Sequence, residues 1–193
     1  ANVARAAGVS VGVIYKYFGD KQSLFLACVR HSLELLDATL REAVPEGADA
    51  ETSIRALVPA LIAAARQHGN YNVLYNEITS GSCREFAPEL AREIESRTAQ
   101  LYTRLFETAK EAGALASGLA PEAAAFFFDN LLMMLQFSYS CDYYQHRMRL
   151  YCGENAAWND EMMADQLTRF LLGAMRGEGS CNISLPTTSE PPA

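Results

Sequence analysis

The sequence predicts a globular, all-α fold, and three observations support this prediction. Apolar residues recur at helical spacing along most of the 193 residues. No short run combines strict alternation of apolar and polar residues with hairpin turn residues, as strands do. The composition, 50% apolar and 20% charged, is that of a packed globular chain. At roughly 100–200 residues per domain, the length fits one helical core with a small additional module.

Capping residues and helix breakers divide the chain into its expected helices. Two short helices around a tight turn fit residues 3–21, and a long helix follows over 20–44 because Asp20 is a good N-cap. Pro59 is expected to kink a helix over 51–67. Further helices are expected over 71–79, 88–113, 121–149 and 160–176.

The same signals give the expected domain boundaries. Residues 1–44 form a helix-turn-helix region that includes the long helix, and residues 45–176 form a helical body. Residues 177–193 are rich in Gly, Ser, Thr and Pro, so we expect a disordered tail there.

Composition and cysteine usage exclude several classes of protein. The most apolar run, 123–135, contains Asp129, so no transmembrane helix is expected, and no basic–apolar signal peptide is visible. The 5 cysteines are odd in number and lack the close pairs of zinc sites or secreted disulfide frameworks. We therefore expect reduced thiols and a soluble, cytoplasmic protein.

Charge is unevenly distributed along the chain. The net charge of −7 argues against binding of a polyanion over the whole surface. Residues 1–31, however, carry Asp20 as their only acid against four cations, which are Arg5, Lys16, Lys21 and Arg30. Contact with DNA is therefore expected at this end of the chain only.

Residues 3–21 have the features of a helix-turn-helix. Small Ala4 and Ala7 allow two helices to approach closely, Gly8 supplies a turn conformation, and Ser10 caps the next helix. Phosphate contacts need hydrogen-bond donors and cations. The second helix, about 11–18, supplies Tyr15, Lys16 and Tyr17, and the start of the next helix supplies Lys21.

The ordered pattern of this segment resembles the TetR (tetracycline-repressor) family of bacterial transcription regulators. The matching positions are Val3, Ala4, Ala7, Gly8, Val9, Ser10, Gly12, Ile14, Tyr15, Phe18 and Lys21. The resemblance implies a homodimer that binds a palindromic DNA operator and is released by a small-molecule ligand in the body. Because the family usually has a full helix before this point, we expect the first helix of the DNA-binding head to be missing from this chain.

The resemblance also implies roles for individual side chains. Tyr17 and Lys21 match phosphate anchors, and Val11, Gly12 and Lys16 match residues that face the groove. Since Val13 stands where the family often has Thr and Val11 offers no hydrogen bond, direct base readout is expected to be sparse. The full expected DNA-binding set is Ser10, Val11, Gly12, Val13, Tyr15, Lys16, Tyr17 and Lys21.

The body, 45–176, resembles the family's ligand-sensing and dimerisation domain. An amide lies in an otherwise apolar stripe of the 121–149 helix, which suits a small hydrophobic ligand with one polar group, although plain core or a dimer interface needs the same stripe. The expected ligand-binding set is Tyr75, Tyr102, Phe106, Phe127, Asn130, Met134 and Phe137. The resemblance implies that 121–149 and 160–176 pair across the dimer, and the face that each residue occupies stays open.

Other functions have weaker support. No nucleophile elbow, phosphate-binding glycine loop or dinucleotide motif is present, so neither an enzyme nor a cofactor is expected. Asp142 and His146, with Cys152 nearby, are too few for a metal site, and Cys83 in a loop is an alternative redox thiol. The sequence therefore predicts a ligand-responsive transcription regulator, most simply a repressor. The alternative is a helical small-molecule-binding or interaction protein with a degenerate DNA-binding head.

Overall fold

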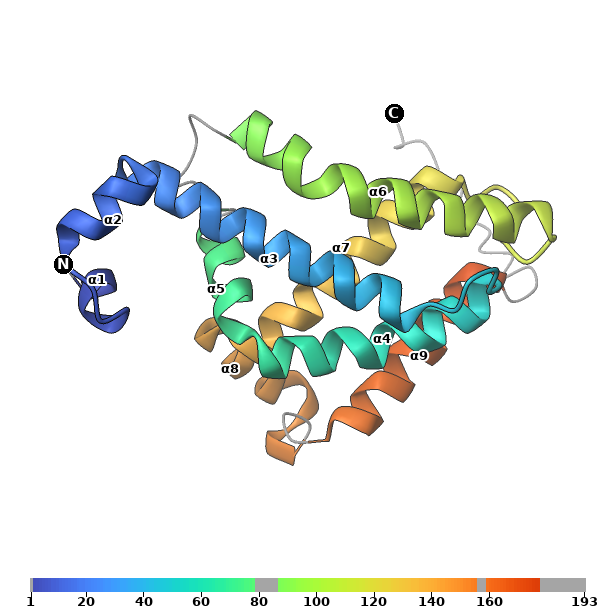
Figure 1. Ribbon diagram of the computed structural model, residues 1–193. Helices are drawn as coiled ribbons and strands as arrows, with labels where there is room; N and C mark the ends of the chain where they lie inside the picture. The colour runs from blue at the N-terminus through green and yellow to red at the C-terminus, as the bar shows by residue number, and fades with distance from the viewer. Residues whose placement is uncertain (1, 79–86, 156–158, 178–193) are drawn as a thin grey trace, which may run out of the picture.

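A computed structural model of the chain describes residues 2–78, 87–155 and 159–177. Within these ranges the chain forms helices joined by turns, without strands, so the predicted all-α class is confirmed (Figure 1). The helices are α1 (Asn2–Ala6), α2 (Val11–Phe18), α3 (Lys21–Ala43), α4 (Ala50–Gln67), α5 (Gly69–Glu77), α6 (Ala87–Glu111), α7 (Pro121–Ser140), α8 (Asp142–Cys152) and α9 (Asp160–Arg176).

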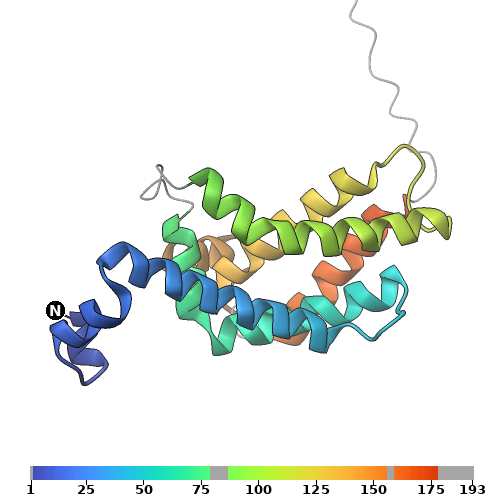
Figure 2. The ribbon, with the colours of Figure 1, turned by 45° about the horizontal axis from the view of Figure 1, so that its top comes forward.

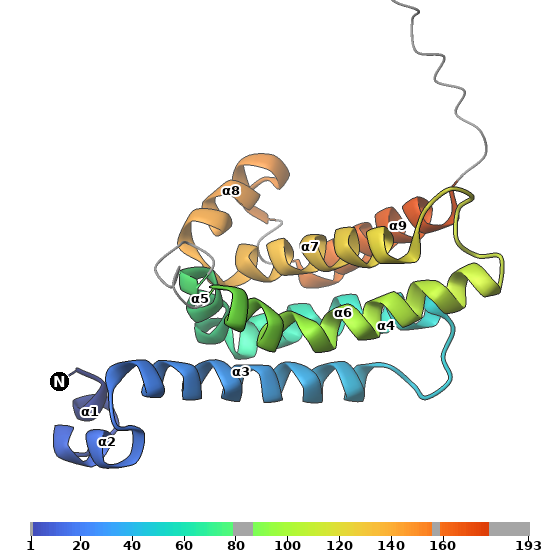
Figure 3. The ribbon, with the colours of Figure 1, turned by 90° about the horizontal axis from the view of Figure 1, so that it is seen from above.

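Helix α3 connects the α1–α2 pair to the rest of the molecule. It begins where the Asp20 carboxylate accepts a hydrogen bond from the Ser23 N–H at 2.7 Å, and it ends at Val44, whose backbone is extended. Only Val29 and Leu40 of α3 are buried, so α3 lies along the surface of the body (Figure 3). The α1–α2 pair projects beyond the body at the start of α3, as Figure 2 shows.

Helix α4 is the centre of the body. Its buried face carries Ile54, Leu57, Val58 and Leu61, which are at most 1% exposed. Their spacing of i, i+3, i+4 and i+7 makes one continuous apolar stripe of an amphipathic helix. α4 packs against α3, α5, α6, α7 and α9. Pro59 lies on the exposed side of α4, which continues through it to Gln67.

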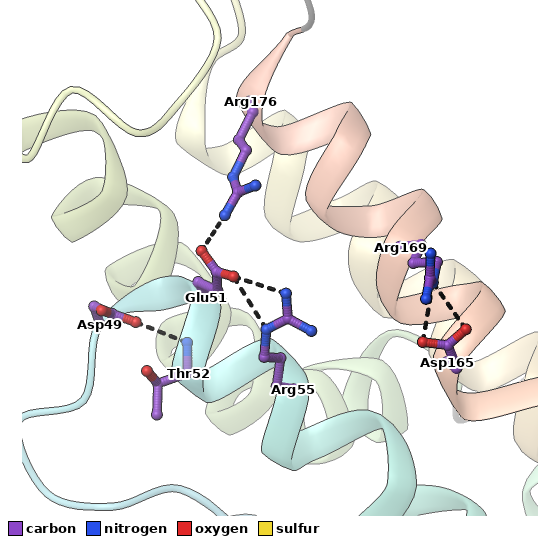
Figure 4. A network of polar contacts seen from close by, with 7 residues as sticks. All are labelled: Asp49, Glu51, Thr52, Arg55, Asp165, Arg169 and Arg176. Atoms are coloured by element: carbon purple, nitrogen blue, oxygen red, sulfur yellow. Dashed lines mark hydrogen bonds and ion pairs between the residues drawn. The ribbon is translucent and has the colours of Figure 1, made fainter. Parts of the chain in front are cut away.

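Ion pairs join opposite ends of α4 and α9. At the start of α4, Glu51 accepts hydrogen bonds from Arg55 at 2.8 Å and from Arg176 at the end of α9 (Figure 4). These hydrogen bonds, from Arg55 first, lower the pKa of the Glu51 carboxyl. At the other end of α4, Arg66 donates to Asp160, the first residue of α9, at 2.7 Å. The two helices are therefore held antiparallel.

The prediction of a single helix over 121–149 is wrong. Cys141 has an extended backbone (φ −111°, ψ 128°) that separates α7 from α8, and α8 then continues to Cys152. The break is held by Ser140, whose hydroxyl donates to the Ala65 carbonyl at 3.3 Å and accepts from the Asn72 amide at 2.9 Å. These partners lie far away in the sequence, and no Pro or Gly marks the position. Tertiary contacts therefore set this boundary.

The other expected helices agree with α3, α4, α5, α6 and α9 to within about two residues at each end. No helix of the described ranges is long and apolar enough to cross a membrane. Cys83, which the sequence analysis expects in a loop, and residues 178–193 of the expected tail over 177–193 lie outside the described residues.

Candidate nucleic-acid interface and ligand cavity

The turn between α1 and α2 is built by small residues and a cap. Gly8 has φ +68°, where a Cβ would be strained. The Val9 N–H then donates back to the Ala4 carbonyl at 3.0 Å, and Ala4 is buried. The Ser10 hydroxyl accepts a hydrogen bond from the Val13 N–H at 3.3 Å, which begins α2. A tight, capped turn therefore sets the direction in which α2 leaves α1.

Helix α2 buries none of its side chains. Tyr17 is 77% exposed and Tyr15 is 54% exposed. Residues four apart share a helix face, so Gly12 lies beside Lys16 and leaves the backbone open there. A two-turn helix that buries nothing adds little to the stability of the body, which leaves its surface available for binding.

The charge around α2 is positive. Lys16 and Lys21 are exposed, and the nearest acid in sequence, Asp20, is occupied in capping α3. Hydrogen bonds from Ser23 lower the pKa of Asp20, so this carboxylate is ionised at neutral pH. Every residue of the expected DNA-binding set, from Ser10 to Lys21, is exposed on this one projection of the molecule. Their contact with DNA stays a prediction.

A cavity of about 90 Å³ lies between α3, α5, α6 and α7. Its apolar wall includes Leu33 and Leu36 of α3 and Met133 of α7. Its aromatic wall consists of Tyr71 and Tyr75 of α5, Tyr102 of α6 and Phe137 of α7. This size is below the roughly 300–1,000 Å³ typical of pockets for drug-sized ligands, so the cavity suits a small molecule.

Glu95 of α6 is the first of two carboxyl groups at the cavity. The Tyr75 hydroxyl donates a hydrogen bond to Glu95 Oε1 and thereby joins α5 to α6. Burial, followed by this hydrogen bond, raises the pKa of Tyr75, so the hydroxyl remains a donor. The Tyr75 ring packs edge-to-face on Phe137 with centroids 5.8 Å apart, which fixes both rings at the cavity wall.

Asp129 of α7 is the second carboxyl group. Burial and then the negative charge of Glu95 raise its pKa from 3.8 to about 6. Within the described part of the chain, Asp129 takes part in no hydrogen bond or ion pair. None of the described side chains that line the cavity is Lys, Arg or His. The cavity is therefore acidic as well as aromatic.

The structure brings only part of the expected ligand-binding set to this cavity. Tyr75, Tyr102 and Phe137 line it. Phe106 is buried in the core instead, where its ring packs edge-to-face on Phe128 at 5.6 Å.

Three expected ligand residues of α7 lie away from the cavity. Phe127 is 58% exposed, Asn130 donates to the Phe126 carbonyl at 2.7 Å, and Met134 lines a groove between α7, α8 and α9. Each residue advances a helix by about 100°, so Asp129 lies on nearly the opposite side of α7 from Phe127. Because α7 has apolar residues on both sides, its periodicity alone did not identify the face that lines the cavity.

Sequence reasoning missed the polar residues of the cavity. They are Ser32, Asn72, Glu95, Thr98, Asp129 and Gln136. One signal was available, because Asp129 is the single acid in the apolar run 123–135. A lone ionisable residue in such a run indicates a site as well as excluding a membrane span. Glu95 had no comparable signal, since it lies in a helix rich in charged residues.

Comparisons with known sequences agree with this geometry. Residues 1–28 match the family model for bacterial regulatory proteins of the tetR family. The HTH-type transcriptional regulator BetI of Paraburkholderia phymatum is 36% identical over 127 residues, which cover 62% of this chain and 64% of that protein. BetI of Paraburkholderia xenovorans is 35% identical over 106 residues, 54% of this chain and 53% of that protein. The chain thus spans between about half and just under two thirds of these relatives.

Solved structures share the fold. A tetR-family regulatory protein from Rhodococcus RHA1 superposes with a TM-score of 0.68 at 19% identity, over 90% of this chain and 84% of that one. GusR of Salmonella enterica gives a TM-score of 0.62 at 22% identity, over 90% of this chain and 82% of that one.

Fold and site together define a helix-turn-helix protein in which a small basic head is carried by a larger helical body. The sequence matches add a likeness to known regulators: residues 1–28 resemble the tetR family of bacterial regulatory proteins, and 127 residues of the chain are similar to BetI of Paraburkholderia phymatum. Its relatives are transcription regulators and not enzymes, as the sequence predicts.

Proposed function

We propose that the protein is a ligand-responsive transcription repressor that acts in the cytoplasm as a homodimer on a palindromic operator. The observation that carries the proposal is the position of α3. This helix begins at the basic α1–α2 pair and also forms one wall of the cavity. A ligand in the cavity therefore contacts the same helix that carries the DNA-binding side chains.

For DNA binding, α2 enters the major groove. The missing Cβ of Gly12 lets the backbone approach the bases, and Val11 and Val13 offer apolar contact to thymine methyl groups. Tyr17 and Lys21 contact phosphates on the flanking strand, and Lys16 contributes charge within the groove. Two such helices in a two-fold dimer read half-sites about 34–36 Å apart, or a multiple of that distance.

For dimerisation, the exposed apolar surface of α7 and α9 is the natural interface. Phe126 and Phe127 of α7 and Phe170 of α9 are each more than half exposed. A groove between α7, α8 and α9, lined by Leu131, Met134 and others, continues this surface. Large exposed aromatic residues are what the buried centre of an interface requires.

For the response to ligand, α6 links the cavity to α3. Arg30 of α3 donates to Glu93 of α6 at 2.7 Å, and Arg97 of α6 donates to Asp37 of α3. Glu95, between these two α6 residues in sequence, faces the cavity. A ligand that binds one arrangement of α6 and α3 more tightly than another shifts the separation of the two heads. A nearly complete release of DNA requires a differential affinity of about 5.5 kcal/mol.

The test is DNA binding by fluorescence anisotropy across a salt series, with DNA from upstream of the protein's own gene. Lys21→Ala is expected to weaken binding to all sequences alike and to flatten the salt dependence by about one unit. Arg41→Ala is the matched control, because Arg41 is an exposed cation at the opposite end of α3. An unchanged salt slope for Lys21→Ala, or an equal change for Arg41→Ala, would contradict the assignment.

A further inference from the structure

Helix α8 has little support from its own chain. Of its 11 residues, all of which the structure describes, only Met148 is buried. The Tyr144 ring packs on the Phe137 ring of α7 with centroids 5.5 Å apart. Gln145 donates a hydrogen bond to the Tyr139 carbonyl at 3.2 Å, so α8 is attached chiefly to the end of α7. Because an isolated helix of this length is only marginally stable in water, α8 needs a further surface against its exposed side.

The exposed side of α8 carries large side chains. Tyr143, Arg147 and Tyr151 follow one another at steps of four, so they lie on one face of the helix. The Arg147 guanidinium lies over the Tyr151 ring, 5.0 Å from its centroid. Leu150, beside Tyr151, is 86% exposed, and Tyr151 is 77% exposed. An exposed patch of this kind, formed by several large side chains together, is typical of an interaction surface.

This patch continues the surface of α7 and α9. A groove of about 340 Å³ lies between α7, α8 and α9, and its walls include Leu131 and Met134 of α7, Arg147 and Tyr151 of α8, and Met163 of α9. Arg147 is the only charged residue among the described residues that line the groove, so covering it desolvates few charges. α8 projects beyond α7 on the side away from α3 (Figure 3). A second copy that docks on α7 and α9 from that side meets α8 as well.

The charge of α8 is opposite to that of the two helices beside it. α8 contains Arg147 and Arg149 against Asp142. Apart from Asp129, which lines the cavity, α7 and α9 contain four acidic residues against two Arg. Within the described part of the chain, Arg147 makes no ion pair, so its charge is available to a partner. Because a two-fold interface places one surface against its own copy, a basic α8 fits the acidic α7 and α9 of a second copy.

We propose that α8 is a dimerisation arm, which packs through Arg147, Leu150 and Tyr151 on α7 and α9 of a second copy of this chain. Two-fold symmetry repeats the contact, so the interface contains it twice. The inference rests on the proposed homodimer and adds a third helix to its interface. The second copy supplies the surface that α8 lacks within its own chain.

The test is the dissociation constant of the dimer, measured by sedimentation of protein with a fluorescent label at its N-terminus over a dilution series from micromolar to nanomolar concentrations. Leu150→Ser combined with Tyr151→Ser is expected to raise Kd by at least about tenfold, because burial of one large apolar side chain is worth about that factor. Arg147→Glu is expected to raise Kd by about tenfold, since the reversal replaces attraction by repulsion at two places in the interface.

Arg104→Glu is the matched control for charge. Arg104 is an exposed cation of α6, outside the surface formed by α7, α8 and α9, so its reversal should leave Kd within about twofold. Leu150 and Tyr151 are exposed in the single chain, so their loss leaves its fold intact, which circular dichroism verifies. Amide hydrogen exchange is the second readout: exchange in α8 is expected to slow at protein concentrations above Kd.

Two results would overturn the proposal: an unchanged Kd in both arm variants, or amide exchange in α8 that is as fast in the dimer as in the monomer. Either result would assign the exposed side of α8 to a different partner and leave the homodimer standing. A wild type that stays monomeric at micromolar concentrations would instead reject the homodimer of the proposed function, and the arm with it.

Discussion

Removal of the Asp129 charge is expected to stabilise the ligand-free protein. The carboxyl group loses hydration in the fold and faces Glu95, which together raise its pKa from 3.8 to about 6. A pKa shift of this size corresponds to at most about 3 kcal/mol, at 1.36 kcal/mol per unit. Because the side chain is only partly buried, we expect Asp129→Asn to raise the free energy of unfolding by about 2 kcal/mol at pH 7–8.

The sign of the pH dependence follows from linkage. The folded protein holds the Asp129 proton more tightly than the unfolded chain does. The contribution of Asp129 to stability is therefore fully present below about pH 4 and is lost as the pH rises to about 6. Asp129→Asn has no proton to lose, so its advantage over the wild type should grow across this window and then remain constant.

The assay is urea unfolding followed by circular dichroism, at fixed protein concentration and in steps from about pH 4 to about pH 8. For a chain of this length, a gain of about 2 kcal/mol in the free energy of unfolding corresponds to a Tm about 4–8 °C higher for Asp129→Asn than for the wild type at pH 7–8. Glu122→Gln, which changes an exposed carboxylate in the first turn of α7, is the control and should not raise the free energy of unfolding, because a negative charge is favourable at a helix N-terminus. A destabilised Asp129→Asn, with the same deficit at every pH, would refute the reasoning, because it would mean that the carboxylate makes a stabilising contact in the fold.

Three further predictions concern the head, the dimer and the link between them. Ser10→Ala removes the cap of α2 and should destabilise the head by about 0.5–2 kcal/mol, which faster amide hydrogen exchange in α2 would reveal and unchanged exchange would refute. Phe127→Asp should weaken the free energy of dimerisation by about 2 kcal/mol or more, measured by sedimentation; an unchanged dimer affinity would show that the interface does not include Phe127. Arg97→Ala breaks the ion pair with Asp37 and should lower the free energy of unfolding by at most about 1 kcal/mol, because Arg97 is exposed; a larger loss in urea unfolding would show that the pair does more than join α6 to α3 at the surface.

The sequence was most informative where local chemistry decides the structure. The α1–α2 turn follows from Gly8 and Ser10, and α3 begins at the Asp20 cap, all within three residues of the contacts that they make. The expected helix over 51–67 likewise agrees with α4, whose buried face carries Ile54, Leu57 and Leu61 at helical spacing.

The sequence was less informative where residues far apart in the chain determine the local structure. The break at Cys141 depends on Ser140 contacting Ala65 and Asn72. The cavity depends on which side of α7 faces α3, α5 and α6, and both sides carry apolar residues. Helical periodicity therefore grouped Phe127 and Met134 with Phe137, although the three lie in different surroundings.

The central claim is that exposed side chains of α2 read a DNA sequence. The most direct test is the ratio of affinities for DNA from upstream of the protein's own gene and for a shuffled duplex of the same composition, measured at one salt concentration. Our account predicts a ratio well above one for the wild type, and a ratio near one after Val11→Ala with Lys16→Ala, since both side chains are exposed and their loss leaves the body intact. Equal affinity of the wild type for both duplexes, at salt concentrations that permit binding, would contradict the account.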